Sequence, residues 1–382
     1  MKYRGDFIVS KFNYREKSAD EVGRTTIFVE IVQSPYLSWL LFSLSLFVTL
    51  IAYSITSNST QLHSQDLFKF EVTQIIKAID QRMQGYQQVL RGGIGLFKAS
   101  EHVNRQEFHD YVTNLQVDKY WPGIQGVGYA VMLKTEEKNA FVDALRLEGF
   151  NEFTVFPAGI RDNYSSILYL EPFTVRNQRA FGYDMYSEKA RHIAMDIARD
   201  NGNVAFSAKV KLVQEDGDDL QNGFLMYLPL YRKGAPIENI AQRQKELIGY
   251  VYSPFRIDNL IEGILLSDKN RQINFSIYDG DSQATEDLLY APKTNPDYLS
   301  RSEKKQFTPL FSMVKTIEFP GRNWTVNFYS TAVFEGIIEN SLAKLVGFTG
   351  TLLSLLLLLL MLNIASSSKK SQQASAKLKV LV

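Results

Sequence analysis

Two runs without charged residues constrain this 382-residue chain more than any other feature. We assign residues 36–56 and 345–365 as transmembrane helices, because each is apolar and about 20 residues long, the length that crosses a hydrocarbon core. The second run is almost pure leucine, which is not the pattern of an amphipathic helix in a soluble protein. A cleaved signal peptide at the first run is the less favoured alternative, because the polar segment 1–35 precedes it and no small-residue cleavage site follows.

Basic residues near the two runs predict their orientation in the inner (cell) membrane. The segment after the second run, 366–382, contains four lysines and no acid, and the segment 1–35 contains six basic residues mixed with five acids. Because basic residues concentrate on the cytoplasmic side of a membrane, both termini are predicted to be cytoplasmic. Residues 57–344 then face the periplasm or the cell exterior.

Composition and missing motifs exclude several classes of protein. The chain has no cysteine, which excludes disulfide scaffolds, thiol nucleophiles and cysteine zinc sites. A net charge of +1 argues against a nucleic-acid partner. The four histidines lack the spacing of a helical zinc site and no nucleophile-elbow motif occurs, so no catalytic residue, metal or cofactor is predicted. The acidic segment 215–219 is interpreted as a hairpin turn, with a calcium loop as the alternative.

A long helix is predicted to follow the first membrane run. Its apolar residues recur at spacings of three and four, close to a heptad seam. The seam consists of Phe68, Val72, Ile76, Ile79, Met83, Tyr86 and Leu90. It predicts packing either on the same domain or against a second subunit, and both alternatives remain open. The glycines of 92–95 are expected to bend the helix, and Asn104 with Glu107 forms a capping box that begins the next one.

The rest of the exterior segment alternates short strands and helices, which predicts an α+β fold rather than a parallel sheet. We expect strands at 127–133, 153–156, 167–170, 204–213, 224–231, 247–253, 273–278, 311–319 and 324–329. We expect helices at 135–148, 187–200 and 258–265. The outline is a long helix, a larger unit of strands and helices, and a smaller one nearer the membrane, flanked by the two transmembrane helices.

An ordered series of short motifs resembles a known sensor family. The series comprises Gly95–Ser100, Pro122–Gly126, Tyr169–Pro172, Phe181–Asp184, Leu228–Tyr231 and Gly249–Arg256. In this order and spacing the motifs resemble the CHASE domain, the extracellular sensor of many histidine kinases and cyclases, including plant cytokinin receptors. The resemblance implies a long helix with a helical cap, 57–115, a membrane-distal PAS-like unit that holds the ligand, 120–255, and a proximal PAS-like unit, 256–332.

The same resemblance implies a ligand site. In cytokinin receptors an aspartate at the place of Asp184 hydrogen-bonds the adenine ring, and a strand residue at the place of Phe206 makes backbone contacts. The implied ligand-binding residues are Tyr183, Asp184, Arg191, Phe206, Ser207, Lys209, Met226 and Leu228. The plant pocket has smaller residues where this chain has Phe206. Many bacterial members of the family have no known ligand, so the shared frame does not imply a cytokinin.

Two of these residues have alternative interpretations that the sequence leaves open. Asp184 would either fix the donors of a heterocycle beside an apolar pocket or bond backbone amides as a turn residue. Arg191 would neutralise an anionic ligand, pair with Asp184, or lie on a solvated helix face.

The predicted function is small-molecule sensing outside the membrane, with a signal passed through the two helices to a cytoplasmic output module. By resemblance, that module belongs to a histidine kinase of a two-component system or to a diguanylate cyclase. The ligand is expected to be cytokinin-like, a purine or another metabolite, and the receptor a homodimer. No output signature occurs in the chain, so it is expected to be a fragment of a longer receptor or to signal through a partner. The alternatives are a membrane-anchored adaptor for a periplasmic protein and an exterior enzyme.

Overall fold

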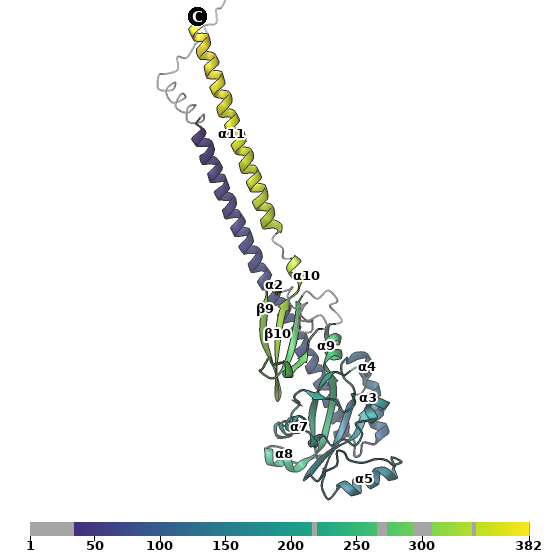
Figure 1. Cartoon of the computed structure of the whole chain (residues 1–382). Helices are drawn as coiled ribbons and strands as arrows, with labels where there is room; N and C mark the ends of the chain where they lie inside the picture. Colours follow the sequence, from purple (N-terminus) through teal and green to yellow (C-terminus); the bar gives the residue numbers. More distant parts are fainter. Residues whose placement is uncertain (1–33, 216–219, 266–272, 293–307, 338–340, 382) are drawn as a thin grey trace, which may run out of the picture. The chain divides into compact units, whose positions relative to one another are not determined.

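The computed structural model describes residues 34–215, 220–265, 273–292, 308–337 and 341–381 (Figure 1). The chain divides into a sheet-containing unit, Gln65–Ile337, and a helical unit made of Met1–Ser64 and Ile338–Val382. Helix α2, Pro35–Ala99, begins in the helical unit and ends in the sheet-containing unit.

The helical unit consists, in its described part, of the first segment of α2 and of helix α11, Ser341–Leu381. Both helices are long and apolar enough to cross a membrane, with mean hydropathies of 1.9 and 2.4 in their most apolar windows. They contain the predicted spans 36–56 and 345–365. The prediction for the polar segment 1–33 lies outside the described residues.

Small residues bring the two helices of this unit together. The Ser45 hydroxyl donates to the Ser354 hydroxyl across the pair at 2.6 Å. Gly350 lies directly against Thr49, so that a Cβ at position 350 would collide with the threonine side chain. Close backbone approach at small residues is the usual means by which helices associate in lipid, where apolar burial gives no net drive.

In the sheet-containing unit, α2 packs on its own domain along the predicted seam. Six of the seven seam residues are buried, and the exception is Ile76, whose neighbour Ile75 is buried instead. The structure therefore supports the first of the two alternatives for this seam. It also shows that the expected bend at 92–95 is wrong, because α2 continues to Ala99.

Glycines in α2 serve close packing rather than a bend. A Cβ at Gly92 would lie 2.5 Å from the Tyr111 hydroxyl, and one at Gly93 would lie 2.9 Å from a methyl group of Val251. Both distances are shorter than side chains allow. The helix thus keeps its backbone hydrogen bonds while two neighbouring elements approach it.

The larger sheet, here called the distal sheet, is entirely antiparallel, with strand order β2-β1-β6-β5-β3 and β4 also paired to β5. Its strands are β1 (Val127–Lys134), β2 (Asn163–Glu171), β3 (Ala205–Phe206), β4 (Val210–Lys211), β5 (Asn222–Tyr231) and β6 (Leu247–Arg256). The smaller, proximal sheet is also antiparallel, with order β8-β7-β10-β9. Its strands are β7 (Ile273–Asp279), β8 (Leu288–Tyr290), β9 (Ser312–Phe319) and β10 (Arg322–Ser330).

Short helices connect and cover these strands (Figure 1). They are α3 (Arg105–Leu115), α4 (Val117–Tyr120), α5 (Lys138–Leu147), α6 (Val175–Gln178), α7 (Lys189–Asn201), α8 (Ile240–Glu246), α9 (Ile257–Leu265) and α10 (Ala332–Ile337). Two 3₁₀ turns are η1 (Met185–Ser187) and η2 (Thr285–Asp287). The capping box of Asn104 and Glu107 is present at the start of α3, and Gly202 ends α7 in the left-handed conformation, at φ +64°. The α+β prediction is confirmed.

Two predicted strands are wrong. Residues 153–156 form only an isolated bridge, between Phe156 and Tyr183. The predicted strand 204–213 is divided into β3 and β4, which both pair with β5, and between them the Lys209 amide bonds the Asp279 carboxylate instead of a strand neighbour. Residues 216–219 of the acidic loop lie outside the described part of the chain, and the described part contains no cluster of three metal-binding side chains.

The distal sheet has two differently covered faces. One face, the α7 face, packs against Ala194, Met195 and Ala198 of α7 and includes Tyr227, Tyr250 and Tyr252 of β5 and β6. The other face, the α2 face, packs against α2, where the rings of Phe255 and Tyr86 lie 4.9 Å apart. Because side chains alternate along a strand, consecutive residues of β5 and β6 belong to opposite faces.

Candidate ligand-binding site

Asp184 lies directly after a turn that only glycine fits. Gly182 has φ +88°, and a Cβ there would collide with the Thr154 carbonyl. The Asp184 carboxylate is fully buried and caps η1. Its Oδ1 atom accepts hydrogen bonds from the amides of Ser165 at 2.8 Å and Tyr186 at 3.1 Å. The backbone-bonding role that the sequence left open is thus present.

Asp184 is also one half of an ion pair. Its Oδ2 atom lies 3.2 Å from the Arg161 guanidinium, whose side chain is only partly exposed. Burial raises the pKa of Asp184 above its ordinary value, and the Ser165 amide and the Arg161 charge oppose this rise. The carboxylate is held by three partners, so it positions the loop before α7.

Arg191, in the first turn of α7, is buried rather than solvated. Its guanidinium pairs with the Glu188 carboxylate and donates to the Tyr183 hydroxyl at 3.2 Å and the Lys211 carbonyl at 3.1 Å. It also lies over the Tyr183 ring, 5.1 Å from the ring centre. The solvated helix face is therefore the wrong interpretation, and the charge partner is Glu188 instead of Asp184.

Buried hydroxyls lie near these two charged groups. Tyr227 and Tyr252 are paired across β5 and β6 with ring centres 6.2 Å apart, and both are fully buried. Their hydroxyls, and that of Ser165, have no hydrogen-bond partner within the part of the chain that the structure describes. Burial raises the pKa of Tyr227 and Tyr252, and the charge of Arg191 opposes the rise in both cases, as expected for a nearby cation.

An unsatisfied buried hydroxyl costs about 1–3 kcal/mol, and such groups are few in native proteins. Tyr250 on the same face shows the usual arrangement, since its hydroxyl donates to the Met195 carbonyl at 3.0 Å. Gly128 makes room for the Tyr252 ring, because a Cβ at position 128 would lie 2.5 Å from that ring. The hydroxyls of Tyr227 and Tyr252, which have no partner among the described residues and feel the charge of the buried Arg191 guanidinium, can hydrogen-bond a small polar ligand.

The remaining residues implied by the resemblance lie elsewhere. Met226 and Leu228 alternate with Tyr227 along β5 and so belong to the α2 face. The ring of Phe206 stacks on Phe319 of the proximal sheet at 4.8 Å. These three side chains form part of the hydrophobic core and do not join Tyr183, Asp184 and Arg191.

Ser207 and Lys209 bond neighbouring backbone and proximal-sheet atoms. The Ser207 hydroxyl accepts from the Leu225 amide at 2.9 Å. The Lys209 amide donates to the Asp279 carboxylate at 2.7 Å, and Asp279 also pairs with Arg322 through both carboxylate oxygens. This segment therefore joins the distal sheet to the proximal sheet.

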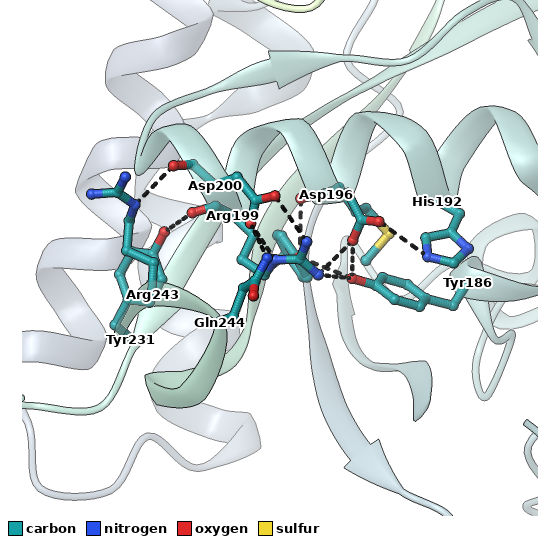
Figure 2. A network of polar contacts seen from close by, with 10 residues as sticks. Tyr186, His192, Asp196, Arg199, Asp200, Tyr231, Arg243 and Gln244 are labelled. Carbon is teal, nitrogen blue, oxygen red and sulfur yellow. Dashed lines mark hydrogen bonds and ion pairs between the residues drawn. The ribbon is translucent and has the colours of Figure 1, made fainter. Parts of the chain in front are cut away.

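A polar network connects α7 to the residues around it (Figure 2). Arg199 bonds the carboxylates of Asp196 at 2.6 Å and Asp200 at 2.7 Å. The Tyr186 hydroxyl donates to Asp196 at 2.8 Å, and its ring stacks on His192. Because Tyr186 is also bonded to Asp184 through its amide, the network links the loop of the site to the helix.

A groove of about 420 Å³ opens next to this network. Its walls include Met132, Tyr186 and Leu247, which also pack against the core on the α7 face. Its rim is polar, with Lys134 and Arg199 among the lining residues. The groove exposes part of the polar network, through Tyr186 and Arg199, to solvent.

Residues 101–290 match the CHASE domain family. This segment is a CHASE domain. The matched segment includes the whole distal sheet and, from the proximal sheet, strands β7 and β8. The match supports extracellular ligand sensing and signalling as the general role of the chain. No curated protein gives a match.

Solved structures with a similar course of the chain are sensor domains. The ligand-binding domain of the Pseudomonas aeruginosa PAO1 amino-acid chemoreceptor PctC, in complex with GABA, is 11% identical, with 70% of this chain and 99% of that chain covered and a TM-score of 0.40. The periplasmic sensory domain of the Campylobacter jejuni chemoreceptor Tlp1 is 10% identical, with 73% and 96% covered and a TM-score of 0.39. An extracellular ligand-binding receptor from Desulfohalobium retbaense DSM5692 is 10% identical, with a TM-score of 0.42. The match covers 69% of this chain and 40% of that receptor.

Proposed function

We propose that this chain is the sensor portion of a transmembrane receptor that binds a small molecule in its distal unit, outside the membrane. The observation that carries the proposal is the group of buried polar side chains on the α7 face. It combines the Arg191 guanidinium with two hydroxyls that have no partner among the described residues, those of Tyr227 and Tyr252. A polar ligand would supply the missing hydrogen bonds and so remove the desolvation penalty of the buried hydroxyls.

The proposed site keeps three of the residues implied by the family resemblance and replaces the others. Tyr183, Asp184 and Arg191 remain, with Asp184 positioning the loop through Ser165 and Tyr186. The new members are Tyr227 and Tyr252. The ligand is expected to be a small polar metabolite, for which a purine or cytokinin-like compound is one class to be tested.

The displaced residues are proposed to couple the two sheets instead. Phe206 stacks on Phe319, and its amide donates to the Pro320 carbonyl at 3.0 Å. Lys209 bonds Asp279 in the same way. A ligand that binds more tightly to one position of α7 would shift the population of that position, and these contacts would carry the shift to β7 and β9 of the proximal sheet. A homodimer, cytoplasmic termini and a kinase or cyclase output belong to the same proposal.

The experiment is a thermal-shift screen of the full chain in lipid nanodiscs against purines, amino acids and organic acids. A hit should raise the melting temperature of the wild type and of Met226→Leu, because Met226 lies on the other face of β5. It should raise that of Tyr227→Phe by less than that of the wild type, because this variant lacks one proposed hydrogen bond to the ligand. A hit that stabilises Tyr227→Phe as strongly as the wild type would place the ligand elsewhere and refute the site.

A further inference from the structure

The ion pair of Glu188 and Arg191 joins two very different environments. The Arg191 side chain is 4% exposed, whereas the Glu188 side chain is 37% exposed. A buried guanidinium needs a counter-charge, because leaving it unpaired is strongly unfavourable. Glu188 supplies that charge from the solvent side of the site, so its carboxylate occupies a position that a dissolved anion can also reach.

Glu188 is held at this position by little else. It is the residue directly before α7, with extended backbone angles of φ −113° and ψ 127°, and its side chain does not cap the helix in the described structure. Rotation of its side chain into solvent would leave the helix start unchanged. Arg191, in contrast, remains fixed by Tyr183 and by the Lys211 carbonyl.

The other charged group of the site is not exchangeable in this way. The Asp184 carboxylate is fully buried, bonded by two amides and paired with Arg161. A cationic ligand would have to compete with Arg161 for a carboxylate that solvent does not reach. A neutral ligand would leave the Glu188 pair in place. The charges of the site therefore favour an anion on Arg191 over a cation on Asp184.

We propose, on the basis of the function proposed above, that the site takes a small organic carboxylate, which replaces the carboxylate of Glu188 on Arg191. The rest of the ligand extends towards the hydroxyls of Tyr183, Tyr227 and Tyr252, which lie around the guanidinium. Arg191 is suited to this role because its planar group binds a carboxylate through two parallel hydrogen bonds. Glu188 is thus an internal competitor that sets the ligand concentration at which the receptor responds.

The experiment uses the full chain in nanodiscs and matched probe pairs that differ only in charge: lactate with lactamide, and benzoate with benzamide. Dissociation constants come from isothermal titration calorimetry. Glu188→Gln removes the competing carboxylate and should bind lactate or benzoate about tenfold more tightly. The reason is that the ligand no longer has to break the charge-assisted bond between Glu188 and Arg191, which is partly exposed to solvent. Asp143→Asn, at an exposed carboxylate on α5, is the control and should leave the affinity unchanged.

Arg191→Gln should abolish carboxylate binding, and Glu188→Gln keeps the test decisive if Arg191→Gln does not fold. Carboxylate affinity that Glu188→Gln leaves unchanged would overturn the exchange. Binding of lactamide or benzamide as tightly as the acids would overturn the carboxylate class while the sensing function stands. If no compound of any charge class binds in the thermal-shift screen, the proposed function itself fails.

Discussion

The hydroxyls of Tyr227 and Tyr252, which have no hydrogen-bond partner in the described part of the chain, make a prediction that reverses the usual effect of a core substitution. Replacing either tyrosine with phenylalanine keeps the buried ring and removes only the oxygen. Because a buried hydroxyl without a partner costs about 1–3 kcal/mol, Tyr227→Phe or Tyr252→Phe should raise the free energy of unfolding without ligand by about 1 kcal/mol. For a unit of this size that corresponds to a rise in melting temperature of about 2–4 °C.

Tyr250→Phe is the matched control on the same sheet face. It removes a hydroxyl that donates to the Met195 carbonyl at 3.0 Å, so it should lower the free energy of unfolding by about 1 kcal/mol. Thermal unfolding of the full chain in nanodiscs, followed by tryptophan fluorescence, measures all three variants. Loss of stability in Tyr227→Phe and Tyr252→Phe equal to that of Tyr250→Phe would refute the reasoning, since it would mean that the two hydroxyls are bonded in the free protein.

Three further predictions concern other parts of the chain. Gly93→Val should destabilise the protein by about 1–3 kcal/mol, because its side chain would overpack against Val251. Gly95→Ala should stabilise it by about 0.5–1 kcal/mol, because no described atom lies within contact of the added methyl group. Thermal unfolding of the two variants measures both effects. The hydrogen bond to Glu171 raises the pKa of His109, so protonated His109 stabilises the fold fully below its unfolded pKa and loses this effect as pH rises through the folded value. His109→Gln should therefore lower the melting temperature at pH 5 and have no effect at pH 9, and an equal effect at both values would contradict this. Gly350→Leu should separate the two apolar helices and reduce their chemical crosslinking within one chain, with unchanged crosslinking as the contrary result.

Much of the fold was predictable from local patterns. The strands β5, β6 and β10 and the helix α7 lie within a few residues of their predicted bounds, because each combines clear periodicity with a turn or cap at its end. The division of the predicted strand 204–213 was not predictable, since it depends on the bond from the Lys209 amide to Asp279. Those partners are distant in sequence and meet only after folding.

The candidate site was predictable only in part, for a related reason. Strand alternation puts the side chains of Tyr227 and Met226 on opposite faces of the sheet, but periodicity does not say which of these faces α7 covers. The sequence also could not distinguish a buried Arg191 from an exposed one, because its burial depends on Tyr183 and on the Lys211 carbonyl. The buried hydroxyls become visible as a site only when their lack of partners among the described residues is known.

Hydrogen–deuterium exchange of the full chain in nanodiscs, with and without a hit from the thermal-shift screen, tests the central claim most directly. Ligand bound at the α7 face should slow exchange in the segment from Tyr183 to Arg191 and in β5 and β6, and leave α5 unchanged. Protection confined to α5, to the proximal sheet or to the helical unit would contradict the assignment of the distal unit as the ligand-binding part of this receptor.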